Sequence, residues 1–260
     1  STEHTNATCH KAIEYARAAG TKVILDIDYR PVLWGLTGIG EGENRFVSNE
    51  SVTQHLLSIL PLCDLIVGTE EEIHIAAGST DTIKCLRKIR SISRAEIVVK
   101  RGALGCSVFD GAIPDCLDEG YTSYGVTVDV LNVLGAGDAF LSGFLRGWLR
   151  DESYEKCCSY ANACGALVVS RHACAPAIPS EEELDNYLQR QQSIARPDLD
   201  TELNHLHRVT TRTPANWGEL CILAFDHRKQ FYDMACQLNA DPARISKLKQ
   251  LLLDATIAGS

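Results

Sequence analysis

The stretch 131-LNVLGAGDAFLSGFLRGWL-149 places a glycine-rich turn directly before an aspartate and an apolar helix. Glycines let a backbone adopt positive φ and approach a ligand closely, and the first turn of a helix offers unpaired N–H groups that attract anions. A carboxylate beside a bound phosphate is favourable only if it accepts a proton during the reaction, as the base in phosphoryl transfer does. Two interpretations stay open: an anion-binding loop with Asp138 as base, and a plain helix entry with Asp138 as a capping residue.

The composition of the chain limits its partners. Among 260 residues, 45% are hydrophobic and 23% are charged, which is typical of a soluble globular protein. The net charge of −9 disfavours a nucleic-acid or anionic-membrane partner, because both require clustered Lys and Arg. No apolar run is long enough to span a bilayer, and the polar start shows no signal peptide. We therefore expect a cytoplasmic protein with no nucleic-acid and no membrane partner.

The eleven cysteines do not indicate a metal or redox motif. No C-x-x-C pair occurs, so neither a zinc ribbon nor a thioredoxin-type site is supported. Their number is odd and several lie inside apolar segments. We expect reduced thiols that pack as small hydrophobic side chains.

Short apolar segments alternate with amphipathic segments along most of the chain, which predicts an α/β layer. The predicted strands cover residues 22–28, 64–68, 96–102, 106–111 and 126–133. The predicted helices cover residues 7–19, 50–60, 69–78, 81–90, 135–150 and 153–170.

The character of the sequence changes after residue 190. Residues 191–214 are polar without a strong periodic face and read as a linker, which separates a first domain (1–190) from the start of a second (215–260). The second part begins with an apolar strand over 218–228, followed by helices over 229–240 and 242–259. The pair His205 and His207 has a spacing that metal ligands use, but its polar linker setting argues against a metal site.

Four further motifs accompany the 131–149 stretch. They are 26-DIDYR-30 and 68-GTEE-71 at predicted strand ends, the strand–turn–strand 98-VVKRGALGCSVF-109, and 161-ANACGALVVS-170 in a helix. Together with 135-GAGDAFLSGF-144 they resemble, in family order, the motifs of the ribokinase-like (PfkB-type) sugar and nucleoside kinases. The chain departs from the family pattern at Asp28 and Gly68, where asparagine is usual.

Longer strings resemble one branch of this family, the kinases that phosphorylate 5-dehydro-2-deoxygluconate in myo-inositol catabolism. These strings are 30-RPVLWGLTGIGEGENRF-46, 67-VGTEEEIHIAAG-78 and 170-SRHACAPAIPS-180. Some members of the branch are fused to an aldolase-like C-terminal domain. The segment 220-LCILAFDHRKQFYDMA-235 resembles the start of that domain. There Asp226, His227 and Arg228 follow an apolar strand, the position at which a (β/α) barrel builds its site.

The resemblance implies an α/β fold. We expect a ribokinase-like layered sheet with flanking helices, plus the start of a (β/α) barrel-like domain. We further expect the chain to be a fragment, because the N-terminal half of the kinase family, which supplies most of the sugar-binding residues, has no counterpart in it. Exposed strand edges would then favour association.

Residue by residue, the resemblance implies a general base, a backbone anion hole, a nucleotide site, a metal-organising carboxylate and two cleft side chains. The base is Asp138, and the anion hole is formed by Gly135, Ala136 and Gly137. The nucleotide site comprises Lys100, Gly102, Gly105 and Asn162. The metal-organising carboxylate is Glu71, and the cleft side chains are Arg30 and Asp28. The residues taken alone leave alternatives open. Glu70, Glu71 and Glu72 also suit a solvated first turn favoured by the helix dipole, and the pair Lys100-Arg101 also suits a surface position.

The resemblance also implies the ligands and the reaction. ATP and Mg²⁺ are the expected cofactors, a sugar is the expected substrate, and both a monovalent cation and a homo-oligomeric parent protein are left open. The expected reaction converts 5-dehydro-2-deoxy-D-gluconate to its 6-phosphate. The alternatives are a kinase for another sugar of the fructose or 2-keto-3-deoxygluconate type, a parent protein that is mainly an aldolase or lyase, and an inactive fragment.

Overall fold

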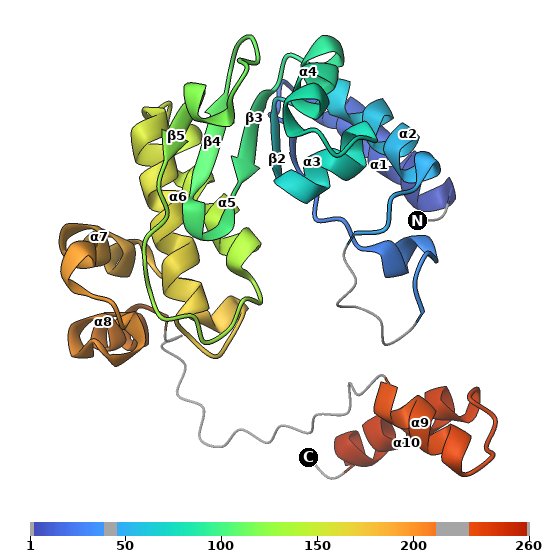
Figure 1. Cartoon of the computed structure of the whole chain (residues 1–260). Coiled ribbons are helices and arrows are strands. Elements are labelled where there is room, and N and C mark those ends of the chain that lie inside the picture. The colour runs from blue at the N-terminus through green and yellow to red at the C-terminus, as the bar shows by residue number, and fades with distance from the viewer. Residues whose placement is uncertain (1–2, 39–45, 212–228, 259–260) are drawn as a thin grey trace.

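The computed structural model describes residues 3–38, 46–211 and 229–258. At its centre is a five-stranded sheet in the order β1-β2-β3-β4-β5 (Figure 1). The first three strands pair in parallel, whereas β4 and β5 extend the sheet in antiparallel pairings. The strands are β1 (Ile24–Asp26), β2 (Leu65–Thr69), β3 (Glu96–Lys100), β4 (Cys106–Phe109) and β5 (Tyr121–Ser123).

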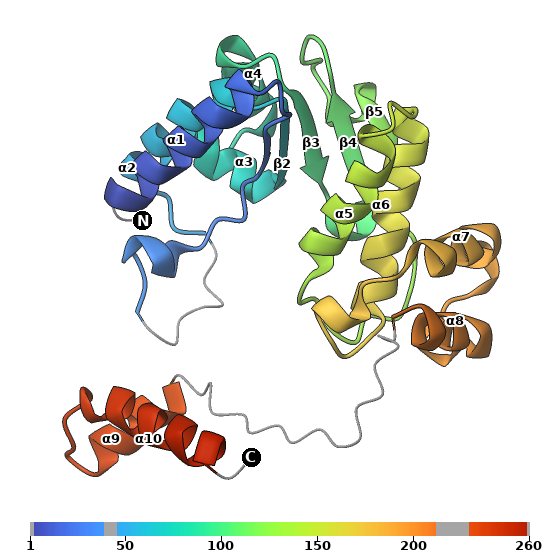
Figure 2. The same ribbon diagram turned by 180° about the vertical axis from the view of Figure 1, so that it is seen from behind.

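Apolar side chains point to both faces of the central strands, so the sheet is buried on two sides. Ile66 and Ile97 pack with helices α1 to α4 on one face, and Val67 and Val98 pack with α5 and α6 on the other. Figures 1 and 2 show these two helical groups with the sheet between them. The first group contains α1 (Glu3–Ala18), α2 (Glu50–Ile59), α3 (Glu70–Ala77) and α4 (Thr82–Ile92), and the second contains α5 (Ala136–Trp148) and α6 (Tyr154–Val169).

Helices α5 and α6 approach each other through two glycines of α5. A Cβ atom on Gly143 would lie 2.5 Å from the carbonyl oxygen of Tyr160, and one on Gly147 would lie 2.8 Å from Cys157 Sγ. Side chains are not accommodated at such distances, so the absence of a Cβ allows the two helices to pack. Phe144, which lies between the two glycines, is fully buried against the sheet.

A smaller hydrophobic cluster joins α6 to α7 (Glu181–Arg190) and α8 (Thr201–Thr211). Within it, Leu167, Tyr187 and Leu203 are fully buried. Residues 201–211 thus differ from the linker expected there. The reason is that one apolar anchor, Leu203, holds α8, and the Asp200 carboxylate accepts a hydrogen bond from the Leu203 N–H at 2.9 Å. With one buried residue among mostly polar ones, this helix resembles a linker in sequence.

The remaining described elements are α9 (Lys229–Gln237) and α10 (Arg244–Ala258), which confirm the helices expected over 229–240 and 242–259. The strand expected over 218–228, with Asp226, His227 and Arg228, lies outside the described residues. In the described ranges, no helix combines the length and the apolar character that a bilayer crossing needs.

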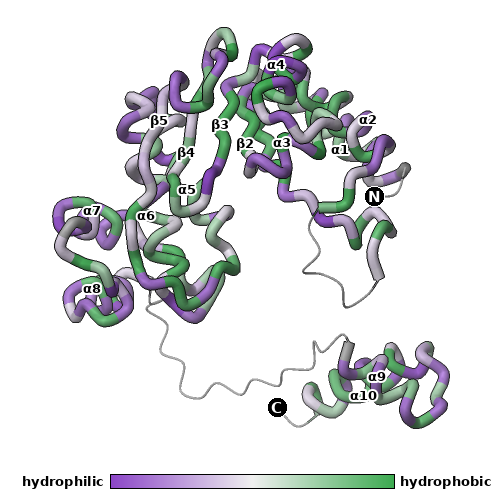
Figure 3. Tube along the Cα trace, in the orientation of Figure 1, coloured by the Kyte–Doolittle hydropathy of each residue, from purple (hydrophilic) through white to green (hydrophobic). Residues whose placement is uncertain are grey.

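The predicted α/β layer is confirmed, with one strand wrong. Residues 126–133 form no strand, and the fifth strand is the shorter β5 before them. The physical reason is the direction of their backbone hydrogen bonds. Asp129 N–H donates to the Ala195 carbonyl, and Leu131 N–H donates to the Val169 carbonyl at the end of α6, so these residues pair with segments outside the sheet. Figure 3 shows the hydrophobic central strands β2 and β3 and the hydrophilic carboxyl end of β3.

Candidate functional site

The start of α5 is shaped by Gly135, the residue that precedes its first turn. Gly135 adopts φ +82°, and a Cβ atom on it would lie 2.6 Å from Cys174 Sγ. Both the positive φ and the close approach require glycine. The preceding loop is held by α6, because the N–H groups of Leu131 and Asn132 donate to the carbonyl of Val169. The glycine-rich turn is therefore a fixed part of the fold.

One member of the predicted anion hole already has a partner within the chain. The Ala136 N–H donates to the Val133 carbonyl at 3.3 Å, and Gly137 and Asp138 follow it in the first turn of α5. The Asp138 side chain is exposed, and no other side chain in the described ranges bonds to it. Its carboxylate is thus accessible to a ligand at the start of the helix.

A lysine lies directly against this first turn. Lys100 ends β3, and its Nζ lies 2.8 Å from Asp26 Oδ1 at the end of β1. The two side chains are only 12% and 16% exposed. A Cβ atom on Gly137 would lie 3.3 Å from Lys100 Nζ, so the ammonium group and the first turn of α5 are neighbours. This cation and the helix dipole both favour an anion at this point.

Asp26 is a site residue that the sequence reasoning missed. Burial raises the pKa of its carboxyl group, and the Coulomb attraction of Lys100 opposes that shift. Burial weighs against the ionised form, so the ion pair with Lys100 is what keeps a charged carboxylate acceptable here. The available signal was its place as the first carboxylate of 26-DIDYR-30, at the carboxyl end of a buried strand.

The two predicted cleft residues pair with each other. Arg30 Nη2 lies 2.8 Å from Asp28 Oδ1. Asp28 adopts φ +29°, a region in which aspartate and asparagine are the favoured non-glycine residues. The backbone therefore accepts aspartate where the family pattern has asparagine, although the charge of Asp28 also helps to raise the pKa of Asp26.

The three glutamates at the start of α3, Glu70, Glu71 and Glu72, differ in their contacts. Glu72 forms a capping box with Thr69, and Glu70 lies 3.6 Å from Arg101 Nε. Glu71, the predicted metal-organising residue, is exposed and bonds to no other residue of the described segments. A Cβ atom on Gly68 would lie 3.0 Å from Ile27 Cδ1, so Ile27 fills the space that an asparagine side chain would need.

Two of the four predicted nucleotide residues, Asn162 and Gly105, lie against residues 123–125, whereas Lys100 lies at the start of α5. Asn162, which is 8% exposed, donates from Nδ2 to Ser123 Oγ at 3.2 Å and to the Tyr124 carbonyl at 2.9 Å. Gly105 adopts φ +90°, and a Cβ atom there would lie 1.9 Å from the Ser123 carbonyl oxygen. Gly102 opens the same turn. Asn162 and Gly105 thus fix the position of this segment.

Among the residues that the structure describes, no three His, Cys, Asp or Glu side chains gather as metal ligands. Mg²⁺ in kinase sites is usually held by one or two carboxylates together with substrate phosphates and water. The exposed carboxylate of Glu71 fits such a partial ligand set.

The model of a family described as pfkB family carbohydrate kinase matches residues 2–181. A second model, described as an uncharacterized protein conserved in bacteria (DUF2090), matches residues 183–260. The 5-dehydro-2-deoxygluconokinase of Halalkalibacterium halodurans is 28% identical over 187 residues, which is 71% of this chain and 51% of that protein. The chain spans about half the length of the curated relatives it matches.

Solved structures show the same fold. Fructokinase from Vibrio cholerae, solved with fructose, ADP and a calcium ion, superposes with a TM-score of 0.56 at 24% identity, over 70% of this chain and 55% of that one. A protein described as a ribokinase II from E. coli, in complex with ATP and Mg²⁺, gives a TM-score of 0.59 at 22% identity, over 73% of this chain and 55% of that one.

Proposed function

Because the chain belongs to the pfkB family of carbohydrate kinases, we propose that it takes part in ATP-dependent phosphorylation of a sugar-acid hydroxyl, with 5-dehydro-2-deoxy-D-gluconate as substrate. The single observation that carries the proposal is the position of Lys100. Its ammonium group lies against the first turn of α5, next to an accessible Asp138. A fixed cation, a helix N-terminus and a free carboxylate are the groups that phosphoryl transfer to an alcohol requires.

The proposed reaction follows from these groups. Asp138 accepts the proton of the sugar hydroxyl as the hydroxyl oxygen bonds to the γ-phosphorus of ATP, and the bond to the bridging oxygen breaks to release ADP. The N–H groups at the start of α5 and the Lys100 ammonium stabilise the negative charge of the moving phosphoryl group. Asp26 holds the ammonium in place through its 2.8 Å contact.

Mg²⁺, when bound, neutralises charge on the ATP phosphates. Glu71 is the carboxylate of this chain that we assign to it, because it is exposed at the start of α3 and pairs with no other side chain in the described part of the chain. The nucleotide is assigned to the surface formed by Gly102, Gly105 and the 123–125 segment. Gly102 is the open position of this surface, because a Cβ atom there would meet no atom within 4 Å, and a ligand can approach its backbone closely.

The choice of sugar is supported by the relatives named 5-dehydro-2-deoxygluconokinase. A substrate panel tests it: ADP release from ATP is measured with 5-dehydro-2-deoxygluconate, fructose and 2-keto-3-deoxygluconate, using the full-length parent protein. We expect the highest kcat/KM with 5-dehydro-2-deoxygluconate. A higher value with either other sugar overturns the substrate assignment but leaves the kinase assignment intact, whereas no ADP release with any sugar overturns both.

A further inference from the structure

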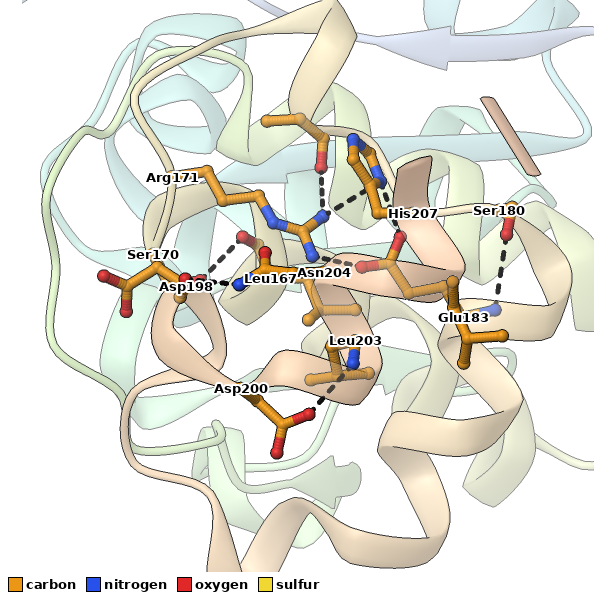
Figure 4. Close-up of polar contacts among 12 residues, drawn as sticks. Leu167, Ser170, Arg171, Ser180, Glu183, Asp198, Asp200, Leu203, Asn204 and His207 are labelled. Carbon is orange, nitrogen blue, oxygen red and sulfur yellow. Dashed lines mark hydrogen bonds and ion pairs between the residues drawn. The ribbon is translucent and has the colours of Figure 1, made fainter. Parts of the chain in front are cut away.

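A buried cluster of ionisable side chains joins the end of α6 to α7 and α8 (Figure 4). Its members are Arg171 after α6, Glu183 in the first turn of α7, and His207 in α8. The Glu183 side chain is completely buried, while the Arg171 and His207 side chains are 10% and 21% exposed. A buried carboxylate is tolerated only where cations and hydrogen-bond donors surround it.

Glu183 uses both carboxylate oxygens in this cluster. Oε1 pairs with the Arg171 guanidinium, and Oε2 lies 2.7 Å from His207 Nδ1. On the other side of the ring, His207 Nε2 lies 2.8 Å from the Pro176 carbonyl oxygen. The same Nδ1 also lies 3.4 Å from Arg171 Nη1, so the ring contacts both partners of the ion pair. Arg171 also donates to the Ala177 carbonyl at 3.0 Å.

The loop that these bonds hold is the one that contacts the start of α5. The carbonyls of Ala177 and Pro176, at the end of the 171–177 loop, lie within hydrogen-bond distance of Arg171 and His207, and Arg171 at its start pairs with Glu183. In the middle of the loop, Cys174 Sγ lies where it blocks a Cβ on Gly135. The Ala173 carbonyl accepts a hydrogen bond from Asn132, which precedes the glycine-rich turn. Any shift of the loop therefore reaches Gly135 directly.

We propose that His207 is a positioning residue for phosphoryl transfer, acting through the 171–177 loop on the anion-binding turn at Gly135. This inference rests on the proposed kinase function. The match to the carbohydrate kinase family ends at residue 181, and α8 lies in the segment matched by the second family. The inference therefore gives a helix outside the kinase match a role in the kinase site. The second segment thereby supports the catalytic turn of the first.

Thiol labelling tests whether His207 holds the 171–177 loop, and it requires no enzymatic activity. Cys174 is partly exposed and its alkylation rate, followed by mass spectrometry of its peptide, reports the position of the loop. We expect His207→Ala to raise this rate by about fivefold, the effect of losing a hydrogen bond or two. The buried Cys85 in α4 reports global unfolding, and its rate stays unchanged in a folded variant.

His205→Ala is the matched control, because His205 lies on the same helix, is exposed, and bonds to no other residue of the described ranges. His207→Gln keeps one donor and is expected to restore part of the slow labelling. In the kinase assay, His207→Ala is expected to lower kcat with little change in the KM for ATP, and His207→Gln to recover part of kcat.

The outcomes separate this inference from the kinase proposal. Unchanged labelling of Cys174 in His207→Ala overturns the inference, and so does faster labelling with an unchanged kcat. Faster labelling of Cys85 in His207→Ala assigns the residue to global stability and overturns the positioning role. If the unsubstituted parent protein transfers no phosphoryl group to any sugar, the kinase proposal and the catalytic role of His207 fail together, while the labelling rates still decide whether His207 holds the loop.

Discussion

The two ends of α5 differ in what surrounds them. The open end, Gly135–Asp138, has an exposed carboxylate and one neighbouring cation, Lys100. The packed side, formed by Gly143, Phe144 and Gly147, lies against α6 and the sheet with no room for a further methyl group. The same helix thus combines a rigid support with accessible polar groups, and substitutions at its two ends should separate activity from stability.

The largest effect is expected at the open end. Lys100→Met removes the ammonium beside Gly137, and we expect kcat/KM to fall about 10²–10³-fold, as when one preorganised charge-stabilising group is lost. Steady-state kinetics measures this. Because Lys100→Met leaves the buried Asp26 unpaired, the double variant Asp26→Asn/Lys100→Met serves as the control. It should regain stability in urea without regaining activity. Recovery of activity in the double variant would exclude a direct role for the ammonium.

Substitutions on the packed side should lower the stability of the fold. Gly143→Ala places a Cβ 2.5 Å from the Tyr160 carbonyl oxygen, and we expect the free energy of unfolding to fall by about 1–3 kcal/mol. Chemical denaturation measures this difference. Gly111→Ala is the matched control, since a Cβ there meets no atom within 4 Å. Equal stability of the two variants would contradict the close α5–α6 packing.

An effect of similar size on stability, with a weaker effect on activity than at Lys100, is expected at Asn162 in α6. Asn162→Asp removes the amide donor that holds Ser123 and Tyr124. We expect a loss of about 1–3 kcal/mol in stability together with a raised KM for ATP and a nearly unchanged kcat. Thermal denaturation and ATP-dependent kinetics check the two parts. A lower kcat at unchanged KM would place Asn162 in the transfer step instead.

The smallest effect concerns the thiols on the packed side. Burial raises the pKa of Cys157 to about 11 and that of Cys164 to about 12, from an ordinary value of 9.0. A group whose pKa is higher in the folded state stabilises the fold fully below its unfolded pKa and loses that contribution as pH rises towards the folded value. Stability should therefore fall between pH 9 and pH 11. Urea midpoints across this range measure it.

Two substitutions provide the controls for the alkaline prediction. Cys164→Ala removes a buried thiol and should make the decline with pH shallower. Cys116→Ala removes an exposed thiol and should leave the decline as it is. An identical pH dependence in the two variants would show that the buried thiols do not contribute to it.

The comparison also explains which features were predictable from the sequence. The start of α5 and strands β1 to β4 have local signals, because glycines, apolar runs and capping residues are recognised within a few positions. The pair Asp26–Lys100 joins residues 74 positions apart, and it depends on β1 and β3 both flanking β2. That information lies in strand order, which no local pattern contains.

The missed helix and the wrong strand have related causes. Leu203 is the one buried residue of α8, and the other side chains of this helix are mostly polar, so the segment resembles a linker in sequence. Residues 126–133 have the alternation of a strand, but their N–H groups reach the carbonyls of Val169 and Ala195. Contacts with residues far away in the sequence determine the secondary structure of both segments. In the candidate site, Lys100 lies against Gly137 at the start of α5, and Arg30 and Asp28 pair with each other.

The central claim is that the open end of α5 transfers a phosphoryl group with Asp138 as the base. The most direct measurement is ATP-dependent phosphorylation of 5-dehydro-2-deoxygluconate by the full-length parent protein and its Asp138→Asn variant. Asparagine has nearly the same shape but cannot accept the proton, so we predict that kcat falls about 10²–10⁴-fold while thermal stability is retained. A variant that turns over at the rate of the unsubstituted protein would contradict the claim.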